Sequence, residues 1–230
     1  MTLFFVVLLF VRGRPQQRAR ESLTWESVLA GARFVRDTPL ILATITLDMF
    51  AVLLGGAVVL LPVYAEHILF TDATGLGWLR AAPAVGALIM ALALAHMPQL
   101  RRPGHAMLWA VAGFGAMTVV FGVSRNLWLS LGALALAGAF DTISVIVRHT
   151  LVQLLTPDRM RGRVSAVNSV FISASNELGG FESGVAARFL GVVASVVAGG
   201  FGTIAVVVAA AKKWPQIAAL GPLEELEEEQ

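Results

Sequence analysis

The chain has 230 residues, of which 57% are hydrophobic and only 14% are charged. A soluble globular domain has about 25% charged residues, so this composition indicates an integral membrane protein. The formal net charge is only +2 and the basic residues are scattered along the chain, which argues against nucleic acid as a partner. Cysteine is absent, so disulfides and thiol chemistry are excluded.

The first eleven residues, MTLFFVVLLFV, are apolar but too few for a membrane crossing. Eleven residues of helix span about 16 Å, roughly half of a hydrocarbon core. No basic residue precedes them and no small-residue cleavage site follows, which argues against a secretory signal. We interpret residues 1–11 as the remnant of a longer transmembrane helix whose beginning is missing. A short interfacial anchor is the alternative.

Residues 12–39 form a basic linker in which we expect an amphipathic helix. Thr24 is a suitable N-cap, and apolar residues recur at spacings of three and four as far as Arg36. The helix should end before Pro39, because proline disfavours helical geometry in the residue before it. We expect this helix to lie on the cytoplasmic surface of the membrane with its apolar face toward the lipid.

Six apolar stretches follow within residues 40–211. Each is long enough, at about 1.5 Å per residue, to cross or nearly cross a hydrocarbon core of about 30 Å. Small residues recur within them, which is typical of helices that pack closely in lipid. The stretches are 40–64, 76–97, 106–123, 127–149, 164–187 and 190–211. The fold predicted for residues 40–211 is therefore an all-α bundle of six transmembrane helices.

The basic residues of this arrangement lie mainly on one side of the membrane. With the linker placed inside, fourteen of the seventeen lysines and arginines fall inside, and only Arg80, Arg125 and Arg188 fall outside. The positive-inside rule then puts the linker and the C-terminus in the cytoplasm. The tail, residues 212–230, is acidic with too little apolar surface to pack, and we expect it to be disordered.

Three acidic residues lie deep inside the predicted spans, where an ionisable side chain costs at least about 2.5–3.5 kcal/mol on insertion scales, and a fourth, Glu182, is expected to reach the outer interface. Asp48 and Asp141 each lie about 12 Å from the predicted cytoplasmic boundary, and Glu177 lies about 20 Å into its span. A carboxylate in a partly desolvated site can exchange protons near neutral pH. These acids are therefore candidates for proton coupling, although Glu177 could instead only hydrogen-bond neighbouring helices.

Polar residues accompany Glu177 along the same span. Asn168 and Asn176 belong to this run, and a helix face so polar must be covered by protein or line water. We therefore include both asparagines among the proton-coupling or cavity candidates.

Arg148 follows Asp141 by seven residues, which returns it to nearly the same helix face two turns lower. The two side chains could form a latch at the cytoplasmic end, or they could take part directly in transport. No nucleophile and base pair, metal-ligand spacing or nucleotide-binding loop is present in the sequence. We therefore expect neither an enzyme nor a cofactor or metal.

Residues 155–168, LTPDRMRGRVSAVN, and 175–179, SNELG, resemble the tenth to eleventh helix region of major facilitator superfamily exporters. The segments GAFD, VR and VVLLPVY fit the same branch, which includes enterobactin exporters and related drug and macrolide efflux proteins. The resemblance extends over about residues 22–213. It adds Asp158, Arg161 and Arg163 of the first segment to Arg148 as candidates for a cytoplasmic gate or latch.

The resemblance implies a transporter of twelve helices in two halves, each built from two inverted three-helix repeats. This chain would be the C-terminal half, and its partner would be the missing N-terminal half or a second copy of the chain. The implied function is proton-driven export of small amphipathic molecules, siderophore or drug-like, across the bacterial cytoplasmic membrane. The alternative is a six-span membrane partner or assembly subunit with no transport activity of its own.

Overall fold

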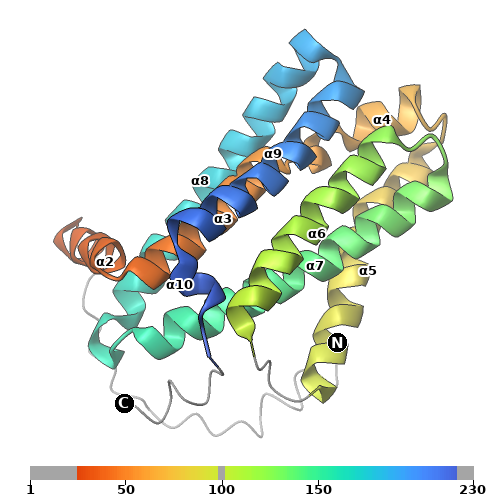
Figure 1. Cartoon of the computed structure of the whole chain (residues 1–230). Helices are drawn as coiled ribbons and strands as arrows, with labels where there is room; N and C mark the ends of the chain where they lie inside the picture. Colours follow the sequence, from red (N-terminus) through yellow and green to blue (C-terminus); the bar gives the residue numbers. More distant parts are fainter. Residues whose placement is uncertain (1–24, 98–101, 222–230) are drawn as a thin grey trace, which may run out of the picture.

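The structure is a computed structural model that describes residues 25–97 and 102–221. Within these residues all regular elements are helices, and the long ones run up and down in a bundle (Figure 1). The predicted helix remnant at residues 1–11 lies outside the described residues, as do residues 222–230 of the predicted acidic tail. The helices are α2 (Trp25–Asp37), α3 (Pro39–Leu54), η1 (Ala57–Leu60), α4 (Leu61–His67), α5 (Ala73–His96), α6 (Pro103–Val123), α7 (Leu127–Leu155), α8 (Asp158–Leu190), α9 (Val192–Lys213) and α10 (Pro215–Ala218).

Five helical segments in the described part of the chain are long and apolar enough to cross a membrane. They are the segment from α3 to α4 together with α5, α6, α7 and α9. The remaining predicted span corresponds to α8, which is the longest helix but carries several charged and polar residues. Its crossing of the membrane remains a prediction.

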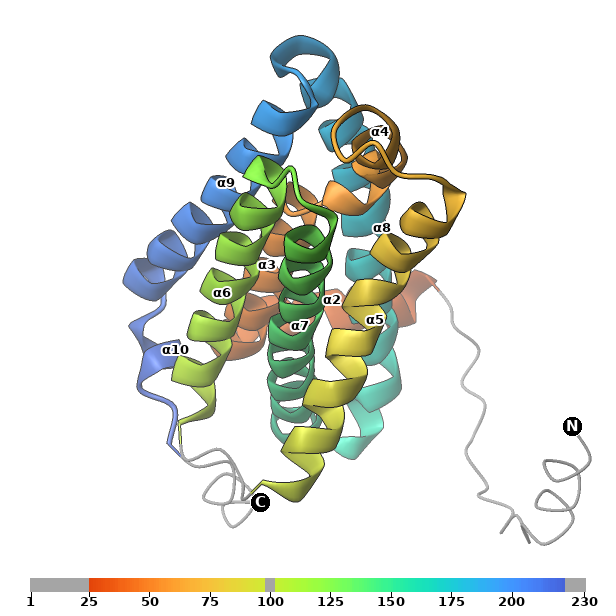
Figure 2. The ribbon, with the colours of Figure 1, turned by 90° about the vertical axis from the view of Figure 1, so that its right-hand side faces the viewer.

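The bundle has two distinct ends. Figure 2 shows α10 and the connection from α7 to α8 at one end, and α4 with the turn from α8 to α9 at the other. The arginines of α2 and of the first turns of α8 lie at the first end, whereas Arg125 and Arg188 lie at the second. The helices thus alternate in direction as the sequence predicted.

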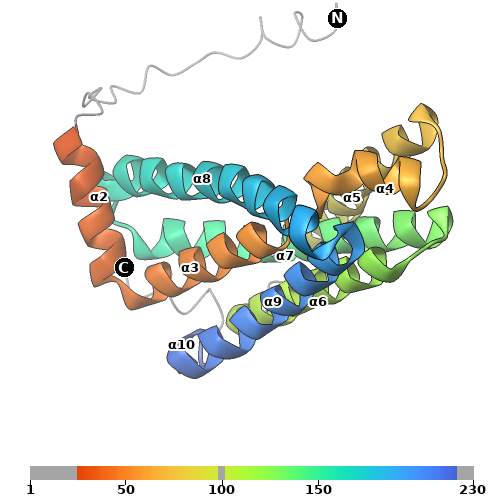
Figure 3. The same ribbon diagram turned by 90° about the horizontal axis from the view of Figure 1, so that it is seen from above.

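The linker helix forms as predicted, from Trp25 to Asp37, and lies across the bundle beside the start of α8 (Figure 3). Its apolar residues pack against α3 and α8, with Val35 buried beside Ile41 and Val164. A Cβ atom on Gly31 would lie only 2.8 Å from the carbonyl oxygen of Arg163, so this glycine allows close approach. The apolar face of α2 therefore contacts protein, where the sequence suggested lipid.

The first predicted span is broken into three helical pieces, because α3 ends at Leu54 and the chain passes through Gly55 and Gly56 into η1 and α4. A Cβ atom on Gly55 would collide with the ring of Phe114, and one on Gly56 would lie 3.0 Å from the carbonyl oxygen of Gly179. The break thus lies where α6 and α8 approach the chain most closely. The predicted span is confirmed as an apolar segment, Pro39–His67, long enough to cross a membrane, but its helix is interrupted at the two glycines.

Close contacts at glycine hold the long helices together. Gly86 of α5 lies against the carbonyl of Ala135, and Gly138 of α7 lies against the carbonyl of Pro83. A Cβ atom at either position would collide with that backbone, so α5 and α7 can pack this closely only with glycine there. This is how helices associate in lipid, where burial from water provides no drive.

Replacing Gly138 by alanine should therefore destabilise the bundle. The added methyl group would push against the backbone of Pro83, and overpacking of this kind costs about 1–3 kcal/mol. Gly132→Ala in the same helix is the matched control, because its Cβ atom would meet nothing within 4 Å. Thermal unfolding in detergent measures both. Equal midpoints for the two variants would contradict the proposed packing.

Candidate functional site

A buried ion pair joins α3 to α7. Nη1 of Arg148 lies 2.5 Å from Oδ2 of Asp48, and the two side chains are only 3% and 6% exposed. Leu47, Val147 and Leu151 are buried beside them. The pair is therefore removed from solvent. In this buried setting, separating the two charges would be costly.

The partner of Arg148 corrects the sequence-based expectation. Same-helix spacing favoured Asp141, but the described residues show no ion pair between Arg148 and Asp141. The charge of Arg148 still acts on Asp141, two turns away along α7. Asp48, Asp141 and Arg148 thus form one electrostatic group in which a single cation faces two acids.

Asp141 lies at the wall of a cavity of about 400 Å³. Its side chain is half-buried, and among the described residues it has neither a hydrogen bond nor an ion pair. Thr118 also lines the cavity, but its hydroxyl already donates to the carbonyl of Phe114. The cavity is lined by Val52, Gly55, Gly56, Ala57, Val58, Val59, Pro83, Phe114, Thr118, Phe121, Leu134, Ala137, Gly138, Asp141, Asn176 and Gly180.

This cavity is mostly apolar and lies where the chain breaks between α3 and η1. Gly55 and Gly56 form part of its wall together with residues of α3 and η1, and helices α5 to α8 supply the rest. Asp141 is the one ionisable residue in the lining, and Asn176 brings an amide from α8. An apolar pocket with a few convergent polar groups is the usual form of a small-molecule site.

The polar face of α8 divides between the inside and the outside of the bundle. Asn168 is buried, and its Oδ1 atom has no hydrogen-bond partner among the described residues. Asn176 lines the cavity, with its side-chain amide donating to the carbonyl of Ile172 over 3.0 Å. Glu177 is exposed and does not line the cavity, so it lies on the part of α8 that the described residues leave uncovered.

The gate candidates after Arg148 lie at the connection from α7 to α8. Asp158 and Arg161 form an ion pair of 2.8 Å that is largely exposed, and Nε of Arg161 donates to the carbonyl of Thr156. Arg163 is half-buried and donates to the sulfur of Met160 over 3.7 Å. The structure thus separates the buried pair of Arg148 from the exposed pair at the connection.

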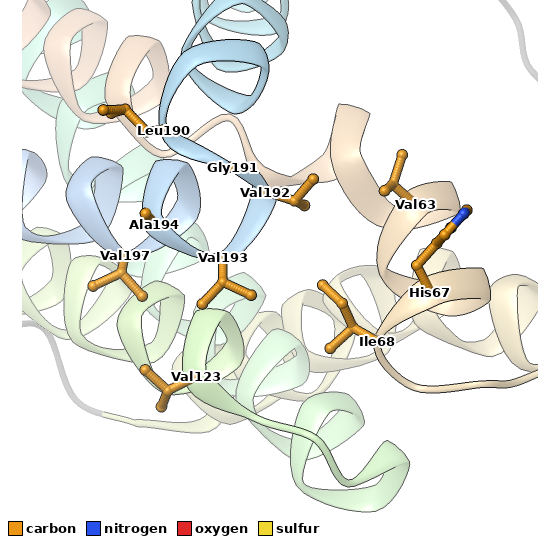
Figure 4. A pocket seen from close by; sticks show the side chains of 10 residues that line it. All are labelled: Val63, His67, Ile68, Val123, Leu190, Gly191, Val192, Val193, Ala194 and Val197. Atoms are coloured by element: carbon orange, nitrogen blue, oxygen red, sulfur yellow. The ribbon is translucent and has the colours of Figure 1, made fainter.

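A larger hollow of about 730 Å³ lies at the opposite end of the bundle (Figure 4). It is lined by Val63, His67 and Ile68 at the end of α4, by Val123, and by residues 190–194 and 197. His67 is its one titratable side chain, and none of the acids predicted from the sequence reaches it. We therefore place the candidate site at Asp141 instead.

Sequence reasoning missed the aromatic and backbone parts of the cavity. Phe114, Phe121 and Pro83 belong to apolar spans and carry no sequence signal of a site. The adjacent glycines Gly55 and Gly56 do carry one, since two glycines inside an apolar run can mark a break in a helix.

Removing one partner of the buried pair should destabilise the protein strongly. Asp48→Asn leaves the Arg148 guanidinium buried without its counter-ion, which costs about 3–5 kcal/mol. The matched control is Asp158→Asn, which breaks an exposed pair worth less than about 1 kcal/mol. Unfolding in detergent gives both values. Similar small losses for the two variants would show that the buried pair is not needed.

Comparison with known proteins places these features in a family. A sequence model for a family of the major facilitator superfamily, described as "transmembrane secretion effector", matches residues 1–228. The enterobactin exporter EntS of Escherichia coli O139:H28 (strain E24377A / ETEC) is 30% identical over 179 residues, and so is that of Shigella boydii serotype 18 (strain CDC 3083-94 / BS512).

The aligned residues make up 78% of this chain but only 43% of each relative, so the match covers less than half the length of these exporters. No solved structure matches the chain significantly. The family match and the five long apolar helices identify a multi-pass membrane protein with an exporter as homologue. The chain belongs to the transmembrane secretion effector family of the major facilitator superfamily.

Proposed function

We propose that the chain is the C-terminal half of a secondary transporter that exports small amphipathic molecules by alternating access. The proposed location is the bacterial cytoplasmic membrane, with the linker and the C-terminus in the cytoplasm. The observation that carries the proposal is the apolar cavity at Asp141, lined in large part by helices long and apolar enough to cross a membrane. Membership of the transmembrane secretion effector family and the similarity to an enterobactin exporter support it.

The way the helices pair supports two three-helix repeats. Contacts between α5 and α7 have a counterpart between α8 and α3, and contacts between α6 and α7 have one between α9 and α3. Exchanging α3, α5 and α6 for α7, α8 and α9 interconverts these pairs, and it leaves the contact between α6 and α9 unchanged. Such pairing is expected of inverted repeats, with α8 as the sixth span.

Asp141 is the strongest candidate for proton coupling. Asp48 is held by Arg148, whereas Asp141 faces the cavity without a partner among the described residues. An ionised carboxylate in an apolar wall is costly unless a counter-charge or water meets it. A proton from outside would neutralise the carboxylate and so remove the cost of its charge. A substrate or water in the cavity would also change that cost. Proton entry and substrate release can therefore be linked at this residue.

Glu177 and Asn168 are weaker candidates for proton coupling than Asp141. Glu177 lies on the exposed part of α8, next to the exposed apolar residues Leu178 and Phe181. A carboxylate at membrane depth faces protein or water, not acyl chains. We infer that an N-terminal six-helix half, or a second copy of the chain, covers this face and completes a water-filled path beside Glu177.

The substrate class rests on the relatives and on the cavity. The relatives are named as exporters of enterobactin, and the cavity is lined mainly by apolar and aromatic side chains. We propose a siderophore or drug-like molecule with apolar and polar parts. No covalent chemistry is required, so we propose neither an enzymatic step nor a cofactor.

The second candidate function is that of a membrane partner or assembly subunit that transports nothing alone. The observation that favours it is the extent of the match, which covers only 43% of the exporter that the chain resembles. A cavity open to an uncovered face could then serve only to seat another membrane protein.

Flux measurements on the chain alone and with a partner distinguish these functions. The chain in liposomes should export no enterobactin as a monomer, but should export it when reconstituted with an N-terminal six-helix half of the same family. A stable homodimer that exports alone would favour two copies forming one transporter. Lack of flux in every combination would favour the subunit function and contradict the transport proposal.

In an export-competent assembly, Asp141→Asn should abolish coupling to protons. Export against a gradient should fall to the level measured without a pH difference, because the residue can no longer release a proton. Passive movement of the substrate down its own concentration gradient should persist. The control is Glu182→Gln, an exposed acid nearer the outer end of α8. Full uphill export by the Asp141→Asn variant would remove Asp141 from the mechanism.

A further inference from the structure

The polar side chains in the cavity at Asp141 favour a positively charged ligand. Only Thr118, Asp141 and Asn176 among the lining residues have polar side chains, and none of the lining residues is basic. We propose that this cavity binds a small aromatic molecule through an ammonium group that pairs with Asp141. The proposal rests on the proposed function, because it names the ligand class of the same cavity, but it is tested by binding and not by transport.

The polar side chains of the lining offer chiefly hydrogen-bond acceptors. The single hydroxyl proton of Thr118 is already donated to the carbonyl of Phe114, which leaves its oxygen as an acceptor. Asn176 donates from Nδ2 to the carbonyl of Ile172, and its Oδ1 atom accepts no hydrogen bond within the described residues. An ionised Asp141 can only accept. An ammonium group supplies only donors and therefore complements this set.

The charges behind the cavity wall are unequal in number. Arg148 forms its ion pair with Asp48, and Asp141 has no ion pair within the described residues. One arginine therefore stands against two acids, so the group has an excess of negative charge when both acids are ionised. A cationic ligand at Asp141 would balance that excess, whereas an anionic ligand would increase it.

The end of α3 adds to the preference for a cation. This helix ends at Leu54, beside the cavity, and its neighbours Val52 and Gly55 line the wall. The C-terminus of a helix carries a partial negative charge from its last carbonyl groups. No basic side chain stands in the last turn of α3 to neutralise it. The backbone and the carboxylate thus favour the same sign of ligand charge.

The rest of the wall fits an aromatic body attached to the ammonium group. Phe114 and Leu134 present apolar surface to the cavity, and the aromatic ring of Phe114 is only half-buried. Aromatic side chains favour aromatic ligands by stacking and favour cations through the face of the ring. The volume of about 400 Å³ lies at the small end of the range for ligand sites, which indicates a small molecule.

Three probes of one shape test the proposal on the full chain in an uncharged detergent. They are naphthylmethylammonium, naphthylmethanol and naphthylacetate, which differ in charge but share the ring system. Equilibrium dialysis against empty micelles at neutral pH measures their binding. The ammonium probe should bind about tenfold more tightly than the alcohol, which corresponds to about 1.4 kcal/mol and is expected of a charge-assisted hydrogen bond. The carboxylate probe should bind most weakly.

Asp141→Asn removes the charge but keeps the shape of the side chain. This variant should bind the ammonium probe no more tightly than the alcohol, and its unchanged affinity for the alcohol would show that the cavity still forms. The matched control is Glu182→Gln, an exposed acid of α8 that does not line the cavity, and it should keep the preference of the wild type.

Three results would overturn the proposal. They are equal affinities of the wild type for all three probes, tighter binding of the carboxylate probe, and an unchanged preference for the ammonium probe in Asp141→Asn. Export of enterobactin by a complete assembly without any preference for the ammonium probe would overturn the ligand class alone. Selective binding of the ammonium probe without export in any assembly would support the ligand class and contradict transport.

Discussion

The ion pair of Asp48 and Arg148 constrains the whole bundle, because it fixes how α3 lies against α7. Both residues stand in apolar helices, where neither charge is tolerable alone. In the proposed repeat arrangement α3 and α7 would occupy equivalent positions, and this contact would then join the two sets of three helices. Every other element packs against one of these two helices or against a neighbour of theirs.

Packing in the bundle relies on contacts between backbones at glycine, and the cavity at Asp141 lies where the chain itself is interrupted. Where α5 meets α7, Gly86 and Gly138 remove the side chains that would separate the helices. At Gly55 and Gly56 the first span loses its regular helix, and the cavity at Asp141 opens beside that break. Glycine thus allows close packing of helices at one level of the bundle and accompanies the break in a helix beside the cavity at another.

The sequence predicted the helices well and their partners poorly. Lipid demands long apolar stretches, so the presence of α5, α6, α7 and α9 could be predicted from residue type alone. The partner of Arg148 could not, because only spacing along one helix can be counted and Asp48 lies on another. Cavity residues such as Phe114 look like any apolar residue of a span until the helices are assembled.

The polar character of α8 bears on how the protein enters the membrane during synthesis. Among the long helices of the described residues, α8 alone lacks the hydropathy of a candidate span, whereas α9 has it and follows after the single residue Gly191 at φ 84°. A translocation channel releases a segment into lipid according to its apolarity. As a sixth crossing, α8 would have to enter the lipid together with α9, with the two helices forming a hairpin. The turn at Gly191 would then determine that α8 and α9 insert as a pair.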